Sequence, residues 1–390
     1  MKVLFWTFIG FDRHTTSRHL LSAMLEQLCI AGHTVHILQK DTGGSLPAIP
    51  ESISGYPVTT DVMPFQAADK SDFISRYLTE LKYIRACRKK ITSDYDAVFV
   101  QSNNEAGFVL RAIRKKLPRT VVTFNVQDIF PDNAVYSGSI KKNSPVFKVL
   151  AAIQRYAYRR ADHIITISED MKETLQKDGV PSEKIEVVYN LSYQDDLYKN
   201  VDTVPVSNMF DQNYFNVVYA GNIGVMQNVD LLIDTAAVMK EETDIWFHII
   251  GNGARKEKLQ AKAKTYGIHN ISFWPMQPPE LAPAVYCTAD INVIPLVRDV
   301  FRTALPSKTA TCLACQKPVI FAIGKDSIFA RKAMEQSGCP VIEADRPEEL
   351  ADTIRRIKNK EMEINTGAFF LENFKKTDNS RKYAEIIVRK

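Results

Sequence analysis

The chain has 390 residues, which exceeds one ordinary domain and suits two domains of roughly 150–200 residues each. Hydrophobic residues make up 45% and charged residues 24%, and these proportions exclude a disordered or collagen-like chain. The net charge of +5 is small for this length, so the distribution of charge is more informative than its sum. No apolar run approaches the roughly 18 residues that are needed to cross a bilayer.

The chain begins with a short apolar stretch, Val3 to Gly10, which Asp12 interrupts. This stretch is too short for a signal peptide and predicts a buried strand, so we expect a cytoplasmic protein. Six cysteines are scattered along the chain. Cys312 and Cys315 form a CxxC pair, but no second pair completes a zinc site. We therefore expect buried structural thiols rather than disulfides or a metal centre.

Short β-branched runs alternate with helix-length stretches along the whole chain. Each run is almost continuously apolar, which is typical of parallel strands covered on both faces. The alternation predicts an α/β fold with two Rossmann-like, doubly wound domains that face each other. The predicted strands are Val3–Thr7, Thr34–Leu38, Ala97–Gln101, Val121–Val126, His163–Ser168, Ile185–Tyr189, Asn216–Ala220, Ile245–Ile250, Ile271–Trp274, Ile291–Leu296, Pro318–Ala322 and Pro340–Glu343.

A polar stretch without a clear period separates the two halves. Ligands bind doubly wound folds at the carboxyl ends of the strands, so we expect the substrate site between the two domains. The predicted boundaries are a first domain at 1–195, a linker at 196–214, a second domain at 215–377 and a polar C-terminal helix at 378–390.

Two glycine-rich loops follow strands of the second half. They are Gly221-Asn-Ile-Gly224 and Gly251-Asn-Gly253, and the cations Arg255 and Lys256 come after the second loop. Glycines let the backbone turn sharply and approach a ligand, and cations nearby can bind phosphate. An ordinary turn and a solvated helix start explain the same residues, so both interpretations stay open.

Pro306-Ser307-Lys308-Thr309 predicts the start of a helix that runs to about Cys315. Lys308 would lie in the first helical turn, where a cation opposes the helix dipole. A bound anion would reverse that penalty. Since residues 300–325 contain no acid, we favour an anion site here over a plain helix start.

Several motifs, in their order and spacing, resemble those of family 4 glycosyltransferases, particularly bacterial enzymes of capsule and O-antigen polysaccharides that use N-acetylated sugars. The resemblance spans nearly the whole chain. The matching motifs are Val126-Gln-Asp-Ile-Phe-Pro-Asp132, Ala161-Asp-His-Ile-Ile-Thr-Ile-Ser-Glu169, Val187-Val-Tyr-Asn190, Tyr219-Ala-Gly-Asn-Ile-Gly224, Phe247-His-Ile-Ile-Gly-Asn-Gly253, Ala289-Asp-Ile-Asn-Val-Ile-Pro295 and Leu305-Pro-Ser-Lys-Thr309.

The resemblance implies a GT-B fold with a nucleotide-sugar donor in the C-terminal domain and an acceptor in the N-terminal domain. It implies transfer with retention at the anomeric carbon, without a metal or other cofactor. It favours UDP as the nucleotide and an N-acetylated hexosamine or deoxy-hexosamine as the sugar. The resemblance places the diphosphate and nucleobase near Gly221, Gly224, Gly253, Arg255, Met276, Gln277, Ser307, Lys308 and Thr309.

Two features depart from the family pattern. Thr303 and Thr311 stand where the family often has two glutamates, and Val225 and Gln227 replace the usual basic pair. We interpret these departures as a change of subfamily. A non-catalytic GT-B subunit and a nucleotide-sugar epimerase of the same fold remain alternatives. A nicotinamide dehydrogenase is disfavoured because no GxGxxG follows the first strand.

Retaining transfer needs a stabilised leaving diphosphate and a group that orients the acceptor hydroxyl. We assign the first task to Lys308 and Arg255, since positioned cations stabilise developing negative charge. Asp128 follows a predicted strand and is our candidate base or orienting group for the acceptor, with Asp132 beside it. A helix cap is the alternative for Asp128. The loop after the first strand is a further candidate acceptor or diphosphate site, or else an ordinary polar loop, with His14, Thr15, Thr16 and Arg18.

Residues 141–160 predict a basic amphipathic helix without acids, and Arg111–Arg119 form a second basic cluster. Such a helix suits anionic lipid headgroups, so we predict a peripheral protein at the inner face of the cell membrane, with a polyprenyl-diphosphate-linked saccharide as acceptor. The alternative is a core helix with a solvated outer face. No nucleic-acid motif accompanies the cations, so we expect no nucleic-acid partner. The predicted apolar stripe is Val146, Val149, Leu150, Ile153 and Ala157.

Overall fold

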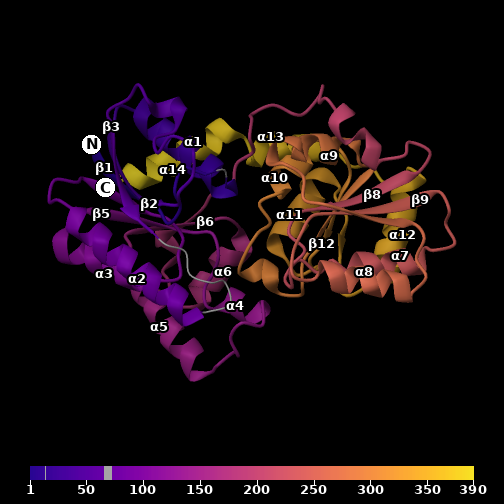
Figure 1. Ribbon diagram of the computed structural model, residues 1–390, viewed down its shortest axis with the longest axis horizontal. Coiled ribbons are helices and arrows are strands. Elements are labelled where there is room, and N and C mark those ends of the chain that lie inside the picture. Colours follow the sequence, from indigo (N-terminus) through magenta and orange to yellow (C-terminus); the bar gives the residue numbers. More distant parts are fainter. Residues whose placement is uncertain (14, 66–72) are drawn as a thin grey trace. The chain divides into compact units, whose positions relative to one another are not determined.

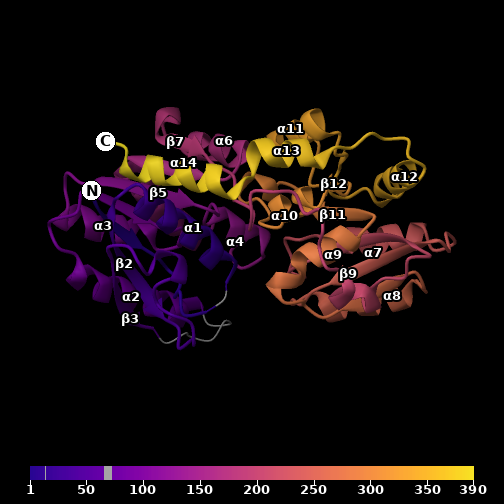
Figure 2. The same ribbon diagram turned by 90° about the horizontal axis from the view of Figure 1, so that it is seen from above.

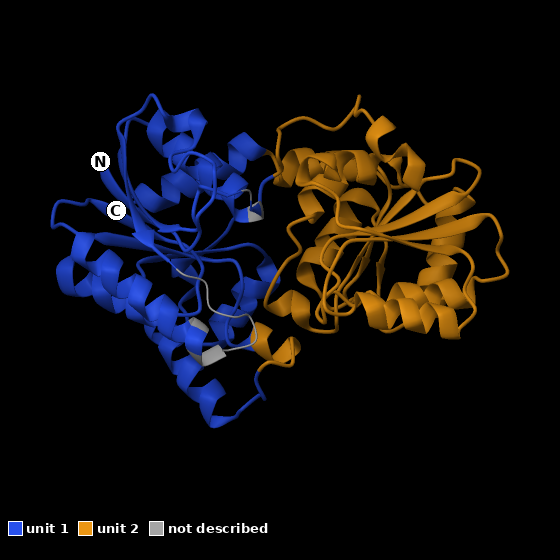
Figure 3. Ribbon diagram, in the orientation of Figure 1, with its two compact units in different colours: residues 1–132, 140–191, 376–390 blue, residues 133–139, 192–375 orange. Residues whose placement is uncertain are grey.

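The computed structural model describes residues 1–13, 15–65 and 73–390 (Figure 1). These residues form two compact units, which Figure 3 distinguishes by colour. Among the described helices, none is long and apolar enough to cross a membrane. Unit 1 comprises Met1–Asp132, Ile140–Leu191 and Lys376–Lys390, and unit 2 comprises Asn133–Ser139 and Ser192–Lys375.

The described part of unit 1 contains a seven-stranded parallel sheet with the order β3-β2-β1-β4-β5-β6-β7. The strands are β1 (Lys2–Trp6), β2 (Thr34–Asp41), β3 (Val58–Pro64), β4 (Ala97–Val100), β5 (Val121–Val126), β6 (His163–Thr166) and β7 (Ile185–Val187). The helices are α1 (Thr16–Ile30), α2 (Phe73–Lys90), α3 (Ala106–Lys116), α5 (Pro145–Arg160), α6 (Glu169–Lys177) and α14 (Lys376–Val388), with 3₁₀ turns at Glu51–Ile53 and Ser182–Lys184. Helix α4 (Asp132–Tyr136) begins at the boundary between the units.

Unit 2 contains a six-stranded parallel sheet with the order β10-β9-β8-β11-β12-β13. The strands are β8 (Phe215–Ala220), β9 (Ile245–Ile250), β10 (Ile271–Trp274), β11 (Ile291–Pro295), β12 (Val319–Ala322) and β13 (Val341–Ile342). The helices are α7 (Asp230–Val238), α8 (Lys256–Thr265), α9 (Ala282–Thr288), α10 (Thr309–Ala314), α11 (Ile328–Ser337), α12 (Pro347–Lys358) and α13 (Thr366–Asn373), with 3₁₀ turns at Val204–Met209, Pro279–Leu281 and Val300–Arg302.

Both sheets are doubly wound, as the apolar runs predict. In each sheet the first strand of the unit, β1 or β8, lies in the interior. The next two strands along the chain extend the sheet on one side of it, and the remaining strands extend it on the other side. The order therefore reverses between β1 and β4 and between β8 and β11. The central strands are buried because helices cover both faces, and their continuous apolar side chains form the two cores. The predicted fold class is therefore confirmed at the level of two doubly wound units.

Strand β3 is the one element of the first sheet that the apolar runs do not predict. It is an edge strand that pairs in parallel with β2 alone. None of its residues is fully buried, and it carries Thr59, Thr60 and Asp61. An edge strand of this kind has no continuous apolar run because it does not need two covered faces.

Helix α14 is last in the chain but belongs to unit 1. It packs against α1 and against strands β4, β5 and β6, and Figure 2 shows it beside α1 and β5. Tyr383 is fully buried, and its hydroxyl donates to the carbonyl of Val188 at 3.0 Å. Unit 1 thus ends at Leu191 and resumes at Lys376, whereas the sequence predicted a break at residues 196–214 and a separate terminal helix.

The apolar stripe predicted for α5 needs correction. Helix α5 begins at Pro145, and Val146 and Val149 are 52% and 60% exposed rather than packed. Its buried side faces α3, which approaches so closely that a Cβ at Gly107 would lie 2.5 Å from the carbonyl oxygen of Ile153. The covered residues are Leu150, Ala151, Gln154, Ala157 and Tyr158. Membrane contact by this helix stays a prediction.

We predict that Tyr383→Ala destabilises unit 1 by about 3–5 kcal/mol, because it empties a fully buried aromatic site. Lys382→Ala on the exposed side of the same helix is the control and should change stability by no more than about 0.5 kcal/mol. Urea unfolding combined with hydrogen-exchange mass spectrometry measures each unit separately. Equal losses in the two variants, or a loss confined to unit 2, would contradict this packing.

Candidate functional site

Two glycine loops and the start of α10 lie at the carboxyl edge of the sheet in unit 2. The loops follow β8 and β9, and the chain reaches α10 after β11, the neighbour of β8 on its other side. The strand order reverses between β8 and β11. Doubly wound folds bind ligands at this kind of reversal, because the loops on its two sides diverge there.

The two glycine loops touch through their backbones. The amide of Gly221 donates to the carbonyl of Ile250 at 2.9 Å, and the amide of Ile223 donates to that of Asn252 at 2.8 Å. Gly251 has φ +152°, and a Cβ there would lie 1.9 Å from the carbonyl oxygen of Gly221. A Cβ at Gly253 would lie 2.3 Å from the carbonyl oxygen of Ile223. Only glycine allows this approach.

Lys308 extends from the start of α10 to the first of these loops. Its Nζ lies 3.7 Å from the centroid of the Tyr219 ring, and a Cβ at Gly221 would lie 2.8 Å from it. Although the residue as a whole is half-buried, the Nζ atom is enclosed. It donates no hydrogen bond to any residue that the structure describes. Burial lowers the pKa of Lys308 to about 8.

An enclosed ammonium without an acceptor is costly, because it has lost its hydration and gained no partner. The cation–π contact with Tyr219 returns about 2 kcal/mol or somewhat more. The hydroxyl of Tyr219 donates to the carbonyl of Asn222, and burial raises its pKa, so the ring under Lys308 stays neutral. An anionic oxygen at this position would supply the missing acceptor. Sequence reasoning gave Tyr219 no role, although it lies in an apolar strand two residues before Gly221.

The residues flanking Lys308 differ in exposure. Ser307 is exposed, whereas Thr309 is buried and its hydroxyl donates to the carbonyl of Pro306 at 2.7 Å. Helix α10 begins at Thr309, one residue later than the prediction requires, and Lys308 is its N-cap. The placement of Lys308 inside the first turn is therefore wrong.

Arg255 is engaged in holding the loop region together. Its Nη2 atom donates to both carboxylate oxygens of Asp230, at 2.7 and 2.6 Å, and Asp230 begins α7. Its backbone amide donates to the carbonyl of Ile223 at 3.1 Å. Lys256 has a similar role, since its Nζ donates to the carbonyls of Gly251 and Trp274 at 2.8 and 2.9 Å. A diphosphate contact by Arg255 stays a prediction.

The remaining donor-site residues lie at the same edge of the sheet. Gly224 ends the first loop, and a Cβ there would lie 2.6 Å from Oε1 of Gln227. Met276 and Gln277 follow β10. Met276 is 46% exposed, and Nε2 of Gln277 donates to the carbonyl of Pro275 at 3.0 Å. Their proximity to a nucleobase stays a prediction.

The predicted acceptor residues belong to unit 1. Thr15 is the exposed N-cap of α1 and accepts from the amide of Arg18 at 3.1 Å. Thr16 begins α1, but its side chain, like all of His14, lies outside the described residues. Asp128 is exposed in the loop after β5. Asp132 begins α4, and burial raises its pKa.

Loops at the carboxyl edge of the first sheet are also tied together. The amide of Phe8 donates to Oε1 of Gln101 at 2.6 Å, which links the loops after β1 and β4. The amide of Gln127 donates to Oγ of Ser102 at 3.2 Å, which links the loops after β4 and β5. Asp128 therefore follows a fixed backbone position, as a group that orients a substrate requires.

Two protein-family models match the chain. One, described as a glycosyl transferase 4-like domain, matches residues 17–190, and the other, described as glycosyl transferases group 1, matches residues 214–360. Together they cover most of both units. The chain belongs to the family 4 glycosyltransferases.

Individual members of the family are distant in sequence. The chain is 26% identical over 201 residues to the putative colanic acid biosynthesis glycosyl transferase WcaI of Escherichia coli (strain K12). This alignment covers 50% of this chain and 47% of WcaI. It is 21% identical over 310 residues to the probable glycosyltransferase WbjE of Pseudomonas aeruginosa. This second alignment covers 75% of this chain and 76% of WbjE. The first match thus spans about half the length of the relative.

Solved structures resemble the chain over almost its whole length. Anabaena HepE, crystallised with UDP and glucose, has a TM-score of 0.71 at 16% identity and covers 99% of this chain and 98% of its own. Sucrose-phosphate synthase from Thermosynechococcus elongatus has a TM-score of 0.71 at 14% identity, and the match covers 100% of this chain and 95% of the synthase chain. The predicted GT-B fold is confirmed by these likenesses.

In this family 4 glycosyltransferase, the two threonines that stand where the family often has glutamates are enclosed by the fold. Thr303 and Thr311 are 2% and 5% exposed. The hydroxyl of Thr303 donates to the carbonyl of Val300 at 3.0 Å, so it serves the turn before α10. Neither residue supplies a carboxylate. Lys308 lies at the glycine loops together with Lys256, and unlike that of Lys256 its Nζ has no acceptor among the described residues.

We predict that Gly251→Ala destabilises unit 2 by more than about 3 kcal/mol, because a Cβ would meet the Gly221 carbonyl and the backbone would be strained. The matched control is Gly267→Ala, which also has positive φ but has nothing within 4 Å of the added Cβ. It should cost about 1–2 kcal/mol. The measurement is urea unfolding, and similar losses in the two variants would argue against the loop contact.

Proposed function

We propose that the chain is a retaining glycosyltransferase that transfers a sugar from a UDP-sugar to a lipid-linked saccharide in cell-surface polysaccharide biosynthesis. The transferred sugar in this proposal is an N-acetylated hexosamine or deoxy-hexosamine. The observation that carries the proposal is the enclosed Nζ of Lys308, which has no acceptor among the described residues and lies at two glycine loops. A diphosphate matches both features, since it is anionic and accepts from backbone N–H groups.

The family members support the donor and the pathway class. HepE has been crystallised with UDP and with UDP-glucose, which favours a uridine diphosphate donor. WcaI is described as a colanic acid biosynthesis enzyme, which favours a role in surface polysaccharide. The sugar and the lipid-linked acceptor rest on the sequence resemblance.

The proposed chemistry divides the task between a few groups. The bond between the anomeric carbon and the diphosphate breaks, and Lys308 stabilises the charge that develops on the leaving group. The amides of Gly221, Ile223 and Gly251 already donate to backbone carbonyls, so the proposed hydrogen bonds to the same oxygens come from other amides of the glycine loops. Asp128 orients or deprotonates the acceptor hydroxyl, which forms the new bond on the same face of the sugar. Arg255 and Asp230 hold the loops in place.

The alternatives have one specific basis. Thr303 and Thr311 provide no carboxylate where the family often has two, which would suit a subunit that binds a donor without using it. A nucleotide-sugar epimerase of the same fold would need no acceptor. These alternatives predict different products and are separated by one assay.

We predict that wild-type protein, supplied with UDP-, GDP- and dTDP-sugars and a short polyprenyl-diphosphate saccharide, forms a product one sugar heavier, read by mass spectrometry. Lys308→Met should lower turnover at least about tenfold, because it keeps the aliphatic stem but removes the charge. The control is Lys258→Met on the exposed side of α8, which makes the same charge change and should leave turnover unchanged. Turnover should persist with EDTA.

Other outcomes of this assay are also decisive. Equal turnover in Lys308→Met and wild type would keep the activity but remove Lys308 from it. An isomerised donor without acceptor would indicate an epimerase. No product together with intact donor binding would favour the non-catalytic subunit.

We also predict that UDP binding weakens as the pH rises through about 8. Burial lowers the pKa of Lys308 to about 8 in the free protein, and a bound diphosphate favours the charged form and raises it again. Affinity should therefore be flat between pH 7 and pH 7.5 and fall by up to about tenfold per pH unit above 8. Calorimetric titration of wild type and Lys308→Met measures this. A flat wild-type profile to pH 9.5 would contradict a catalytic or binding role for this ammonium.

A further inference from the structure

Two thiols from neighbouring helices of unit 2 meet near its surface, and neither takes part in the proposed transfer. Cys287 lies on α9 and is partly exposed, whereas Cys315 is the C-cap of α10 and is only 4% exposed. The two helices are in contact (Figure 1). The sequence paired Cys315 with Cys312 as a CxxC motif. The structure instead brings Cys315 to a cysteine of the preceding helix.

The contact between the two sulfur atoms follows from the geometry of α9. Sγ of Cys315 lies 3.7 Å from the carbonyl oxygen of Pro283 and donates to it. Pro283 and Cys287 are four residues apart, so they lie on the same side of the helix, about one turn from each other. On that side the Cys315 thiol also comes within hydrogen-bonding distance of the Cys287 sulfur. Its single proton can therefore turn between a carbonyl and a second sulfur.

The surroundings give the two thiols different properties. The hydrogen bond with Cys315 lowers the pKa of Cys287, and the nearby ammonium of Lys317 adds to this effect, although burial opposes it. The same hydrogen bond, together with burial, raises the pKa of Cys315. A thiolate is the nucleophilic form of cysteine, and reactive cysteines are partly exposed and lie near cations. Cys287 therefore meets both conditions, and a protonated thiol lies directly behind it.

The other cysteines of the chain lack these features. Cys29, Cys87, Cys312 and Cys339 are buried, and burial raises the pKa of each to between about 11 and about 12. Buried thiols of this kind are inert. The sequence predicted buried structural cysteines throughout, and Cys287 is the exception because α9 lies at the surface of unit 2.

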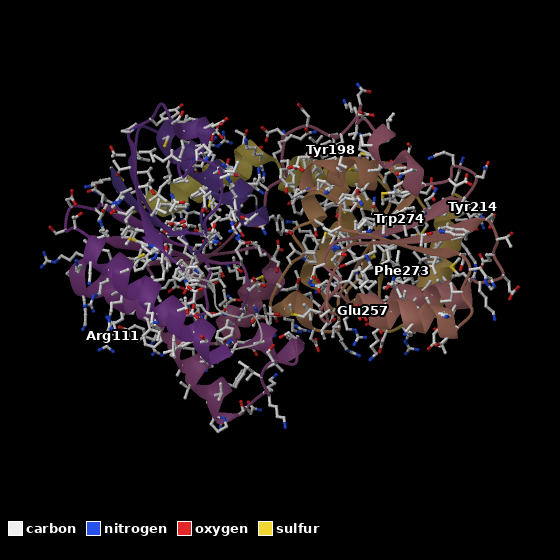
Figure 4. All side chains as sticks on the ribbon, viewed as in Figure 1. Arg111, Tyr198, Tyr214, Glu257, Phe273 and Trp274 are labelled. Atoms are coloured by element: carbon white, nitrogen blue, oxygen red, sulfur yellow. The ribbon has the colours of Figure 1, made fainter. Side chains whose placement is uncertain are left out.

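The segment before β8 shields one side of the thiol pair. Tyr198, labelled in Figure 4, donates its backbone amide to the carbonyl of Ala314 at 3.0 Å, one residue before Cys315. Burial raises the pKa of Tyr198 to about 12, and the charge of either thiolate would raise it further, so its hydroxyl stays neutral beside the pair. This shielding favours reaction with a small oxidant, such as a peroxide, over reaction with a bulky one.

We propose that Cys287 is a modification site, at which a peroxide oxidises the thiolate and Cys315 resolves the product to a disulfide. The Cys287 sulfur attacks one oxygen of hydrogen peroxide, the O–O bond breaks, and hydroxide leaves, which forms a sulfenic acid. The Cys315 sulfur then attacks the Cys287 sulfur, and the S–O bond breaks. The proton of Cys315 joins the departing oxygen as water. The peroxide accepts the two electrons that the thiols lose.

This inference goes beyond the proposed transferase activity and does not require it. It rests on the meeting of α9 and α10, on the unequal exposure of the two thiols and on the cation beside them. Reactive thiols that respond to oxidants usually have a second thiol poised to resolve the sulfenic acid. Cys315 fills that role here, whereas Cys312 lies on the buried side of α10.

The test exposes the whole reduced chain to a small molar excess of hydrogen peroxide. Remaining thiols are alkylated, and the linkages are mapped by mass spectrometry after digestion. The first product should be a disulfide between Cys287 and Cys315, which dithiothreitol reverses. Cys29, Cys312 and Cys339 should remain available for alkylation after denaturation, because they are buried in the folded protein.

Two variants separate the roles of the thiols. Cys315→Ser keeps a hydrogen-bond donor beside Cys287 but cannot resolve, so a sulfenic acid should accumulate at Cys287 and be trapped by dimedone. Cys287→Ser should leave the other cysteines unoxidised at the same peroxide concentration. A structural role for the pair would predict neither the dimedone adduct nor its dependence on Cys315.

A third variant tests the cation. Lys317→Gln should slow the oxidation of Cys287 about threefold, because the thiolate loses a neighbouring positive charge. The control is Lys264→Gln at an exposed position of α8, which makes the same charge change and should leave the rate unchanged. Equal slowing in both variants would remove Lys317 from the site.

Three results would overturn the inference. They are oxidation of Cys287 no faster than that of the buried Cys339, a disulfide between Cys312 and Cys315 in place of the proposed one, and no dimedone adduct at Cys287 in Cys315→Ser. Urea midpoints check that each variant is folded. The linkage map of wild type decides the proposal even where a variant is unstable.

Discussion

The candidate donor site depends on a contact between two backbones. The loops after β8 and β9 approach so closely that a side chain at Gly251 would overlap the carbonyl of Gly221. This contact fixes the ends of two neighbouring strands at the point where the strand order reverses. Arg255, Asp230 and Lys256 then tie the loops to α7 and to the end of β10. Backbone hydrogen bonds from Gly221 and Ile223 hold the loops in one conformation.

The second feature on which the candidate donor site depends is the charge of Lys308, whose Nζ has no acceptor among the described residues. Lys40 in unit 1 is a buried cation with partners, since it has Glu80 at 2.6 Å as well as the ring of Phe65. Lys308 has the ring of Tyr219 but no carboxylate among the described residues. A fold that needed Lys308 only for packing would be more stable with an apolar residue there. The unpaired charge and the glycine loops beside it are the features on which the proposed diphosphate site rests.

Unit 1 separates its charges differently. Its buried polar contacts, such as those from Gln101 and Ser102, join loops at the carboxyl edge of the sheet and give Asp128 a fixed neighbour. Its excess cations lie instead on the outer helices, where α2 and α3 present them around one groove.

The sequence by itself determined the fold class and the position of the glycine loops. The runs at 121–126 and 245–250 are strands with the predicted bounds, because strands buried on both faces need continuous apolar residues. Edge strand β3 lacked that signal. Only the tertiary structure decided that Arg255 is paired and Lys308 is not, that α14 completes the first unit, and that the cations of α2 and α3 share one groove. Such outcomes depend on residues far apart in the chain, whose meeting leaves no local pattern in the sequence.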